Sequence, residues 1–394
     1  MNEKQNFRKV IVGFKNNLKS EPSHLFVSPG RVEFIGNHTD HQGGRTLSFA
    51  INRYIFAAIS LRDDKQVQIF SHNYRKPINV DLNDLTKKED ELGKSAALIR
   101  GVAAYFNKSG YKYGGFDAFT FSTIPAGMGL SSSAAFEVLI ATIFNELYND
   151  KKIDELEIAK ASRYSEIEYF GKPCGLLDQI TVSYGELVNC DFSKEMPIKE
   201  VMSANLLDHF DFFIIYTGKS HSKLTHHYKA ILDEMEMVSN EYGKKFLSEI
   251  DENQFKADFA DLTLKLPQRA VNRALHYFDE NNRVDELVKY LKVSNDQEIL
   301  RIISESGESS NTLLENMTYD GDNRKLLQKT YYRIKRQFPK VAVRVHGGGF
   351  AGTLLVISPK TARIKINLQA FCRFMPNLRL LNILPASMKP GEVK

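Results

Sequence analysis

One segment constrains the fold of this chain more than any other: residues 116–148 pass from an apolar run, through a glycine- and serine-rich turn, to a second apolar run. Phe116–Ile124 is short and rich in aromatic and β-branched residues, which predicts a buried strand. Ser131–Tyr148 carries apolar residues at spacings of three and four, which predicts a helix. The sequence PAGMGLSSSAA joins the two at Pro125–Ala135. The chain therefore contains a strand–turn–helix unit, and we expect a mixed α/β fold.

The turn has the composition of an anion-binding loop. Gly127 and Gly129 let the backbone approach a ligand without a Cβ in the way, and three serines, Ser131–Ser133, open the predicted helix. Free N–H groups and the helix dipole attract a phosphate there. No lysine follows, so this is not the GxxxxGK[ST] loop. The alternative is a serine-rich helix cap, but the glycines before it and Ala134–Ala135 after it favour the phosphate interpretation.

A second segment, Pro29–Gly44, reads PGRVEFIGNHTDHQGG and gathers polar side chains between an apolar run and paired glycines. Sugar hydroxyls need several fixed donors and acceptors, so this density suits a sugar-binding loop. Two alternatives stay open: a polar surface turn, and a metal site that uses His38, Asp40 and His41.

Two further segments are weak on their own. Val343–Val356 (VRVHGGGFAGTLLV) predicts a strand, a glycine turn and a strand, which a tight hairpin would also give. Cys174–Gln179 (CGLLDQ) places Asp178 just after a glycine turn, where an acidic residue can act as a catalytic base.

The remaining chain continues the mixed pattern. Short apolar or β-branched runs predict strands at Leu25–Ser28, Tyr54–Leu61, Val67–Phe70 and Asp211–Thr217. Residues 223–336 are mostly charged with helical spacing. A new strand-rich run starts after Gly185, so we place a domain boundary between Tyr184 and Asp211 and expect an N-terminal domain of residues 1–195 and a C-terminal domain of residues 196–394.

Composition narrows the class of function. The 53 basic and 48 acidic residues give a net charge of +5 over 394 residues, a mild bias that suits an anionic substrate such as a nucleotide. No basic tract with interleaved aromatics predicts nucleic-acid binding, and no run is long and apolar enough to predict a membrane helix. Three cysteines argue against a disulfide framework. We expect a cytoplasmic protein.

Taken in order, these segments resemble the galactokinase branch of the kinase superfamily named for galactose, homoserine, mevalonate and phosphomevalonate kinases. PGRVEFIGNHTDHQGG resembles the galactokinase signature, PAGMGLSSSAA the superfamily's ATP-phosphate loop, and VRVHGGGFAGT its third motif. CGLLDQ, TGKSHSKLTHHY (Thr217–Tyr228) and RALHYFDENNRV (Arg273–Val284) agree as well. The resemblance covers nearly the whole chain. It implies a two-domain α/β (α+β) kinase fold with the active site in the cleft between the domains.

The resemblance also implies an activity: transfer of the γ-phosphoryl group of ATP to the C1 hydroxyl of galactose, with Mg²⁺, in a monomer whose partners are the sugar and ATP. By position, Asp178 is the base and Arg31 the cation beside it. Ser133 and Glu166 match the magnesium ligands, although Glu168 lies two residues from Glu166. The sugar-contacting positions are Asn37, His38, Asp40, Gly175 and Tyr228, and those of the phosphate loop are Gly127, Gly129, Leu130, Ser131, Ser132, Ser133 and Ala134.

The chain departs from the galactokinase pattern at three positions. Asn37 stands where galactokinases usually have a glutamate that faces the C6 hydroxyl, His41 stands in place of a tyrosine, and His346 replaces a small hydroxyl residue. A neutral Asn37 would no longer repel a C6 carboxylate, and a protonated His41 would attract one. We have no interpretation of His346.

These departures keep a uronic acid 1-kinase (galacturonokinase) open as an alternative to galactokinase. A catalytically silent sugar sensor on the same fold is a second alternative, which the intact serine–alanine loop argues against. The sugar signature argues against mevalonate or homoserine as substrate. His221, His226 and His227 suggest a metal by composition, but their spacing favours histidines at the surface or the pocket rim. Adjacent His226 and His227 should point apart.

Overall fold

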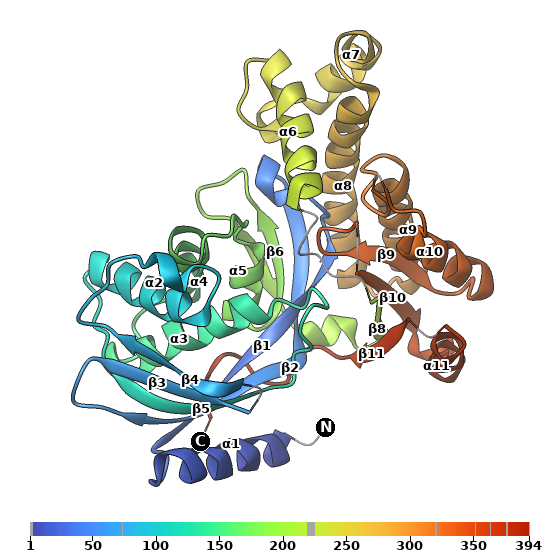
Figure 1. Cartoon of the computed structure of the whole chain (residues 1–394). Helices are drawn as coiled ribbons and strands as arrows, with labels where there is room; N and C mark the ends of the chain where they lie inside the picture. The colour runs from blue at the N-terminus through green and yellow to red at the C-terminus, as the bar shows by residue number, and fades with distance from the viewer. Residues whose placement is uncertain are drawn as a thin grey trace.

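The alternation of strand-like and helix-like runs builds two β-sheets with helices packed around them (Figure 1). The structure is a computed structural model that describes residues 3–72, 74–218, 225–319, 321–350, 352–362, 364–375 and 377–393. The strands are β1 His24–Ile35, β2 Arg45–Leu61, β3 Gln66–Ser71, β4 Tyr74–Asp81, β5 Phe116–Ser122, β6 Leu187–Asp191, β7 Ile198–Met202, β8 Phe210–Tyr216, β9 Ala342–His346, β10 Thr353–Pro359, β11 Arg379–Ile383 and β12 Gly391–Glu392. The α-helices are α1 Glu3–Leu18, α2 Ser95–Lys108, α3 Ser132–Tyr148, α4 Glu155–Tyr164, α5 Leu177–Tyr184, α6 Thr225–Glu241, α7 Glu252–Lys265, α8 Gln268–Lys292, α9 Asp296–Thr312, α10 Leu326–Gln337 and α11 Lys365–Arg373.

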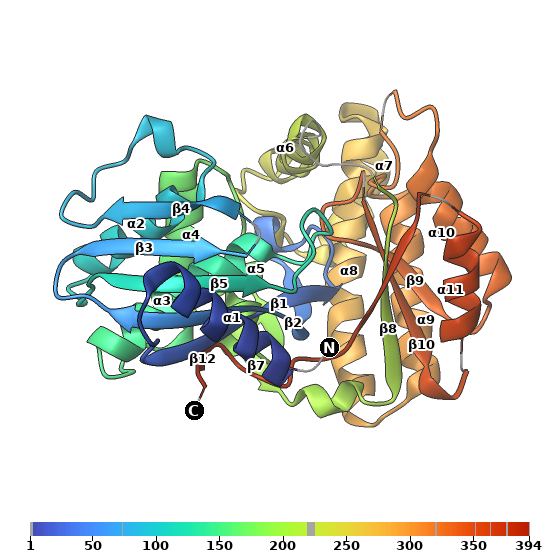
Figure 2. The ribbon, with the colours of Figure 1, turned by 60° about the horizontal axis from the view of Figure 1, so that its bottom comes forward.

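The larger sheet carries the strands in the order β12-β1-β2-β5-β3-β4, with β6 added to β2 and β7 added to β6. Its pairs are antiparallel except β3 with β5. Helices α2–α5 lie on one face, and α1 packs on the other through Val10 and Phe14 (Figure 2). Phosphate-loop residues 125–131 leave the end of β5 and open α3, so the predicted strand–turn–helix unit is confirmed.

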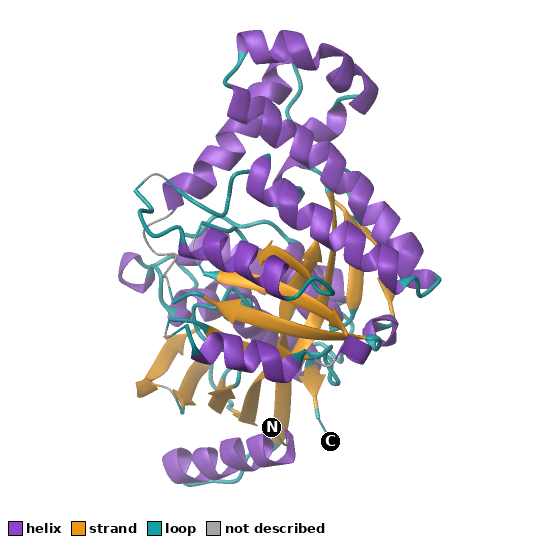
Figure 3. Ribbon diagram, turned by 90° about the vertical axis from the view of Figure 1, so that its right-hand side faces the viewer, coloured by secondary structure: helices purple, strands orange, loops and turns teal. Residues whose placement is uncertain are grey.

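The smaller sheet has the order β11-β8-β10-β9, all antiparallel. Both faces of this sheet are covered. Strand β8 shows the reason: the side chains of this strand alternate between two apolar clusters. Phe212 and Ile214 face the cluster that includes α8 and α9, whereas Phe213 and Ile215 face the cluster of α10 and α11. Figure 3 shows helices on both sides of this sheet.

The expected division at residue 195 separates the two sheets only approximately. β7 lies beyond that point and forms a hairpin with β6, and β12 returns from the C-terminal end to pair with β1. An open sheet edge presents unpaired N–H and C=O groups, and β12 covers this edge of β1 at Phe26 and Val27. The sequence prediction missed both strands, because β7 is half exposed and β12 has two residues.

Among the described residues, no helix combines the length and the apolar character needed to cross a membrane.

Candidate active site

The predicted base and its predicted cation meet where β1, α3 and α5 come together (Figure 1). Arg31, in β1, donates from Nε to Asp178 Oδ1 at 2.7 Å and from Nη2 to Asp178 Oδ2 at 2.6 Å. Ser131, which precedes α3, also donates its hydroxyl to Asp178. Arg31 is buried, whereas the Asp178 side chain is 36% exposed. The carboxylate is therefore held rigidly and is still open to a ligand.

The surroundings of Asp178 determine its charge. Burial acts to raise the pKa of this carboxyl group, but Arg31 and the Ser131 hydroxyl more than offset it and leave the pKa below its ordinary value. Asp178 is thus ionised at neutral pH, which is the state in which a carboxylate accepts a proton.

The phosphate loop presents its backbone at the surface. Gly127, Gly129 and Ser132 are exposed, whereas Leu130, Ser131 and Ala134 are buried and anchor the loop. Gly127, Gly129 and Ser131 all have positive φ. Left-handed residues that alternate with ordinary ones make successive N–H groups converge on an anion.

Ser133 and Glu166 lie together beside this loop, as the predicted metal pair requires. The Ser133 hydroxyl donates to Glu166 Oε1 at 3.1 Å. Glu166 is 2% exposed and belongs to the π-helical turn Ser165–Phe170, a distortion that is frequent at functional sites. Glu168 is exposed, so the structure favours Glu166 over its neighbour.

Three residues that the sequence analysis missed complete this cluster. Lys172 donates to Glu166 at 2.7 Å, and Gln179 donates to Glu166 at 2.8 Å and to Glu137 at 3.2 Å. Burial and the neighbouring Glu166 raise the pKa of Glu137 well above its ordinary value. One oxygen each of Glu137 and Gln179 is buried without a hydrogen-bond partner. Carboxylate and amide oxygens that lack a hydrogen-bond partner are suitable ligands for Mg²⁺.

Asp40 and Gly175, two of the predicted sugar-contacting residues, face each other. A Cβ at position 175 would overlap the Asp40 carboxylate, so the close approach requires glycine. Burial and the nearby Asp178 raise the pKa of Asp40 to about 6. This contact places the sugar signature directly beside the CGLLDQ segment, as the resemblance implied.

His38 connects the sugar signature to the third motif. Its Nε2 lies 3.0 Å from the Gly348 carbonyl, which only accepts, so Nε2 carries the proton. The His38 Nδ1 then accepts from His41 Nε2 at 3.3 Å. Tyr228 donates to the Gly349 carbonyl at 3.1 Å and packs its ring against Gly348.

The structure argues against the suggested attraction between a protonated His41 and a sugar carboxylate. Burial lowers the pKa of His41 to about 4. The ring is therefore neutral at physiological pH and adds no positive charge to the pocket.

Asn37 has surroundings that the sequence analysis did not predict. It is 1% exposed, and its amide nitrogen donates to Glu33 at 3.0 Å and to the Gly347 carbonyl at 2.9 Å. Its amide oxygen accepts from Asn316 at 2.8 Å and Ser310 at 3.4 Å. An amide has two donors and two acceptor positions, so all four are used within the protein. This arrangement favours support of the loop over direct contact with a sugar.

Helix α8 explains why the stretch RALHYFDENNRV belongs to the site. His276 Nε2 lies 3.0 Å from the Asn37 carbonyl, and Glu280 accepts from the N–H groups of Gly36 and Asn37 at 3.1 and 3.3 Å. Burial acts to raise the pKa of Glu280, but His276 and Arg283 bring it to about 2. Helix α8, in the second half of the chain, thus fixes the backbone of the sugar signature at Gly36 and Asn37.

The histidines of TGKSHSKLTHHY contribute less. His221 lies outside the described residues. The rings of His226 and His227 do not point apart as expected, because their centroids are 3.9 Å from each other at the start of α6. Within the described part of the chain, no group of three or more His, Cys, Asp or Glu side chains is arranged to hold a metal ion, so neither histidine metal alternative gains support.

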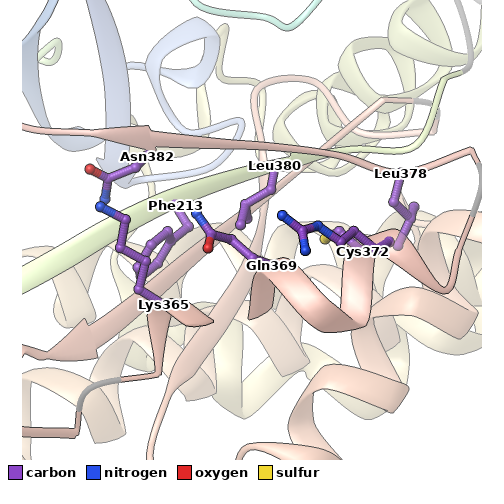
Figure 4. Close-up of a pocket in the computed structure, with 8 residues that line it drawn as sticks. Phe213, Lys365, Gln369, Cys372, Leu378, Leu380 and Asn382 are labelled. Carbon is purple, nitrogen blue, oxygen red and sulfur yellow. The ribbon is translucent and has the colours of Figure 1, made fainter. Parts of the chain in front are cut away.

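A cavity of about 420 Å³ lies away from these residues, between α11 and β11 (Figure 4). It is lined by Phe213, Lys365, Gln369, Cys372, Arg373, Leu378, Leu380 and Asn382. None of the predicted catalytic or binding residues lines it.

Comparison with known proteins agrees with this geometry. Residues 13–61 match the galactokinase galactose-binding signature, and residues 97–186 match the N-terminal domain of the GHMP kinases. A galactokinase from Thermotoga petrophila is 31% identical over 339 residues, covering 86% of this chain and 90% of the relative. A galactokinase from Limosilactobacillus fermentum is 28% identical and covers 91% of each chain.

Solved structures show the same fold. The Lactococcus lactis galactokinase complexed with galactose superimposes with a TM-score of 0.82, at 24% identity over 98% of both chains. The mevalonate kinase of Methanococcus jannaschii gives a TM-score of 0.66 at 17% identity, covering 93% of this chain and 99% of its own. With the signature, the phosphate loop and the Arg31–Asp178 pair in place, the chain belongs to the galactokinase family of sugar kinases.

Proposed function

We propose that this protein transfers the γ-phosphoryl group of ATP to the C1 hydroxyl of galactose, giving α-galactose 1-phosphate and ADP. The observation that carries the proposal is the ionised Asp178 carboxylate, fixed by Arg31 and Ser131 between the phosphate loop and the sugar signature. The oxygen of the C1 hydroxyl forms the new bond to the γ-phosphorus, the bond between that phosphorus and the β,γ-bridging oxygen breaks to release ADP, and the proton of the C1 hydroxyl passes to Asp178.

Arg31 has two roles in this scheme. Its guanidinium keeps Asp178 ionised before the reaction, and its positive charge opposes the negative charge that gathers on the transferring group. Arg31 Nη1 also donates to the Gly129 carbonyl at 2.5 Å, so the same side chain connects the base to the phosphate loop.

The phosphates of ATP are proposed to lie at the start of α3, against residues 127–134. Ser133 and Glu166 would hold Mg²⁺, which neutralises phosphate charge when bound. Lys172, which is paired with Glu166, would then share that carboxylate with Mg²⁺.

Asp40, His38, Gly175 and Tyr228 are proposed to surround the sugar. Asp40 offers a carboxylate acceptor, and Gly175 leaves the space that this carboxylate occupies. The hydrogen-bond partners of Asn37 are acidic or neutral, among them Glu33 and Glu280. These partners do not favour an anionic C6 group, so the structure gives the uronate alternative no added support.

A coupled ADP-release assay over galactose, galacturonate, glucuronate, glucose, arabinose and N-acetylgalactosamine tests the proposal. We expect galactose to give the highest kcat/KM. Faster turnover of galacturonate would establish the uronate kinase instead, and sugar binding without ADP release from any sugar would indicate the sensor. Size-exclusion chromatography tests the proposed monomer.

A further inference from the structure

The carbonyl side of the phosphate loop is fixed from outside the loop, by two side chains of the smaller sheet. Thr353 Oγ1, in β10, donates to the Met128 carbonyl at 3.1 Å, and His346 Nε2, in β9, lies 3.1 Å from the Gly129 carbonyl. Thr353 and His346 are directly paired across the two strands, so both side chains point to the same face of the sheet. They are 0% and 1% exposed.

The chemistry of the contact defines the state of His346. A carbonyl only accepts, so Nε2 carries the proton and Nδ1 does not. Nδ1 is buried without a hydrogen-bond partner. Burial and the positive charges of Arg31 and Arg344 lower the pKa of His346 to about 3. The ring is therefore a neutral, single-tautomer donor at physiological pH.

Three successive carbonyls of the loop are engaged in this way. In addition to the bonds from Thr353 and His346, Arg31 donates from Nη1 to Gly129 and from its backbone N–H to Leu130, at 2.5 and 3.3 Å. When these carbonyls are held on one side, the loop cannot turn its peptide planes, and its N–H groups stay available on the ligand side.

We propose that His346 and Thr353 form a carbonyl clamp, through which the smaller sheet holds the phosphate loop in its ATP-binding shape and in register with Arg31. Both are positioning residues for phosphoryl transfer, and this role rests on the proposed function because it assumes that the loop binds ATP phosphates. The clamp assigns a role to His346, the departure that the sequence left without an interpretation.

The test compares variants that keep or remove the donor. Thr353→Val removes the hydroxyl at nearly constant volume, whereas Thr353→Ser keeps it; His346→Leu removes the ring donor, whereas His346→Gln keeps an N–H. We expect Thr353→Val and His346→Leu each to raise the KM for ATP about tenfold, the loss expected for one hydrogen bond. The Kd for galactose, measured by calorimetry, should stay within about twofold.

The variants that keep the hydrogen-bond donor, together with a matched control, distinguish an effect on the position of the loop from an effect on the stability of the protein. Thr353→Ser and His346→Gln should stay within about threefold of wild type in KM for ATP. Thr330→Val is the matched control, because Thr330 in α10 is also 0% exposed and donates to a single carbonyl, that of Leu326, at 2.7 Å. It should lower thermal stability without changing the KM for ATP.

Binding of a non-hydrolysable ATP analogue, measured by calorimetry, distinguishes a failure of the clamp from a failure of the proposed function. If wild type does not phosphorylate galactose, the proposed function fails, yet weaker analogue binding by Thr353→Val and His346→Leu still supports the clamp. The clamp is overturned if both variants bind the analogue as tightly as wild type while losing as much stability as Thr330→Val. No analogue binding by wild type overturns both.

Discussion

The proposed role of Asp178 as a proton acceptor can be tested separately from a role in folding. Asp178→Asn removes the proton acceptor, so kcat should fall by at least about 100-fold, the low end for loss of a general base. ATP affinity should be retained, because Asp178 lies outside residues 127–134 and an asparagine oxygen can still accept the hydrogen bond from Ser131. Steady-state kinetics and nucleotide calorimetry measure the two quantities.

The matched control for this variant is Asp191→Asn. Asp191 also holds an arginine and a serine, Arg45 at 3.4 Å and Ser193 at 2.6 Å, but it lies outside the proposed active site. We expect Asp191→Asn to keep kcat within about threefold. Near-normal kcat in Asp178→Asn would exclude Asp178 as the base.

Asn37 leads to a different expectation from the one that the sequence alone suggests. A glutamate at position 37 would lie beside Glu33, whose carboxylate is 3.0 Å from the present amide nitrogen. Two buried carboxylates repel each other, so Asn37→Glu should lower the free energy of unfolding by about 3 kcal/mol or more. Denaturant unfolding measures the loss.

A second substitution tests the cause of that loss. Glu33→Asn combined with Asn37→Glu restores one carboxylate and one amide, with Arg344 close by at 2.7 Å from the Glu33 position, so it should recover much of the stability. If Asn37→Glu alone is as stable as wild type, the amide is free of Glu33 in solution, and direct reading of the sugar C6 group becomes the better interpretation.

At the level of elements, the strand–turn–helix unit around α3 depends on backbone shape. Gly129 has φ +71°, but the nearest atom to a Cβ there is 3.8 Å away. The glycine is therefore needed for its conformation and not for space. Gly129→Val should raise the KM for ATP about tenfold, because a residue with a Cβ is strained by about 1–2 kcal/mol at positive φ. Steady-state kinetics with ATP as the varied substrate measures it.

Gly110 provides the control for backbone strain. It has φ +77° in the turn after α2, and nothing lies within 4 Å of its Cβ position. Gly110→Val should lower the melting temperature and leave the KM for ATP unchanged. Equal KM values for the two variants would show that the loop tolerates the change in shape.

The elements near this unit were also the ones that the sequence predicted best. Apolar spacing located β5 and α3 to within two residues, because both are regular and consist mostly of apolar residues that are buried along most of their length. The Asp178 and Arg31 pairing followed from the resemblance. The cluster of Lys172, Gln179 and Glu137 did not follow from the resemblance. Glu137 lies one helical turn after Ser133, but only folding brings Glu166 and Gln179 to that turn.

In the whole molecule, the two halves share one core. Phe34 of β1 and Phe49 of β2 contact Phe212 of β8, with ring centroids 5.8 and 5.0 Å apart. The buried Arg344 of β9 donates to the Glu33 and Phe34 carbonyls of β1 at 3.1 and 2.8 Å. A boundary drawn from sequence missed this, because the joining residues are apolar strand residues that look alike in either half.

Four histidines, the buried His276 and His346 and the half-buried His38 and His41, lie at this junction and make it sensitive to acid. The pKa values of His38 and His346 are lowered to about 3, that of His41 to about 4, and that of His276 in the same direction. Burial is the first cause for each. The unfolded chain takes up these protons near pH 6.5, before the folded chain does. The stability contributed by the neutral rings is therefore complete above pH 6.5 and is lost as the pH falls below it.

The variant His346→Gln removes one of these four titrating rings, so its comparison with wild type measures the contribution of His346. Between pH 7.5 and 5.5 the unfolded wild type gains about one proton at His346 that the folded form does not, which costs about 1.4 kcal/mol of stability. Asp40, whose pKa is raised to about 6, acts in the opposite direction in both proteins and cancels in the comparison. The variant should therefore lose about 1.4 kcal/mol less than wild type over this range in denaturant unfolding. His209→Gln, at an exposed position, is the control and should follow wild type. Parallel curves for His346→Gln and wild type would show that His346 titrates equally in the folded and unfolded chains, contrary to its burial at the junction.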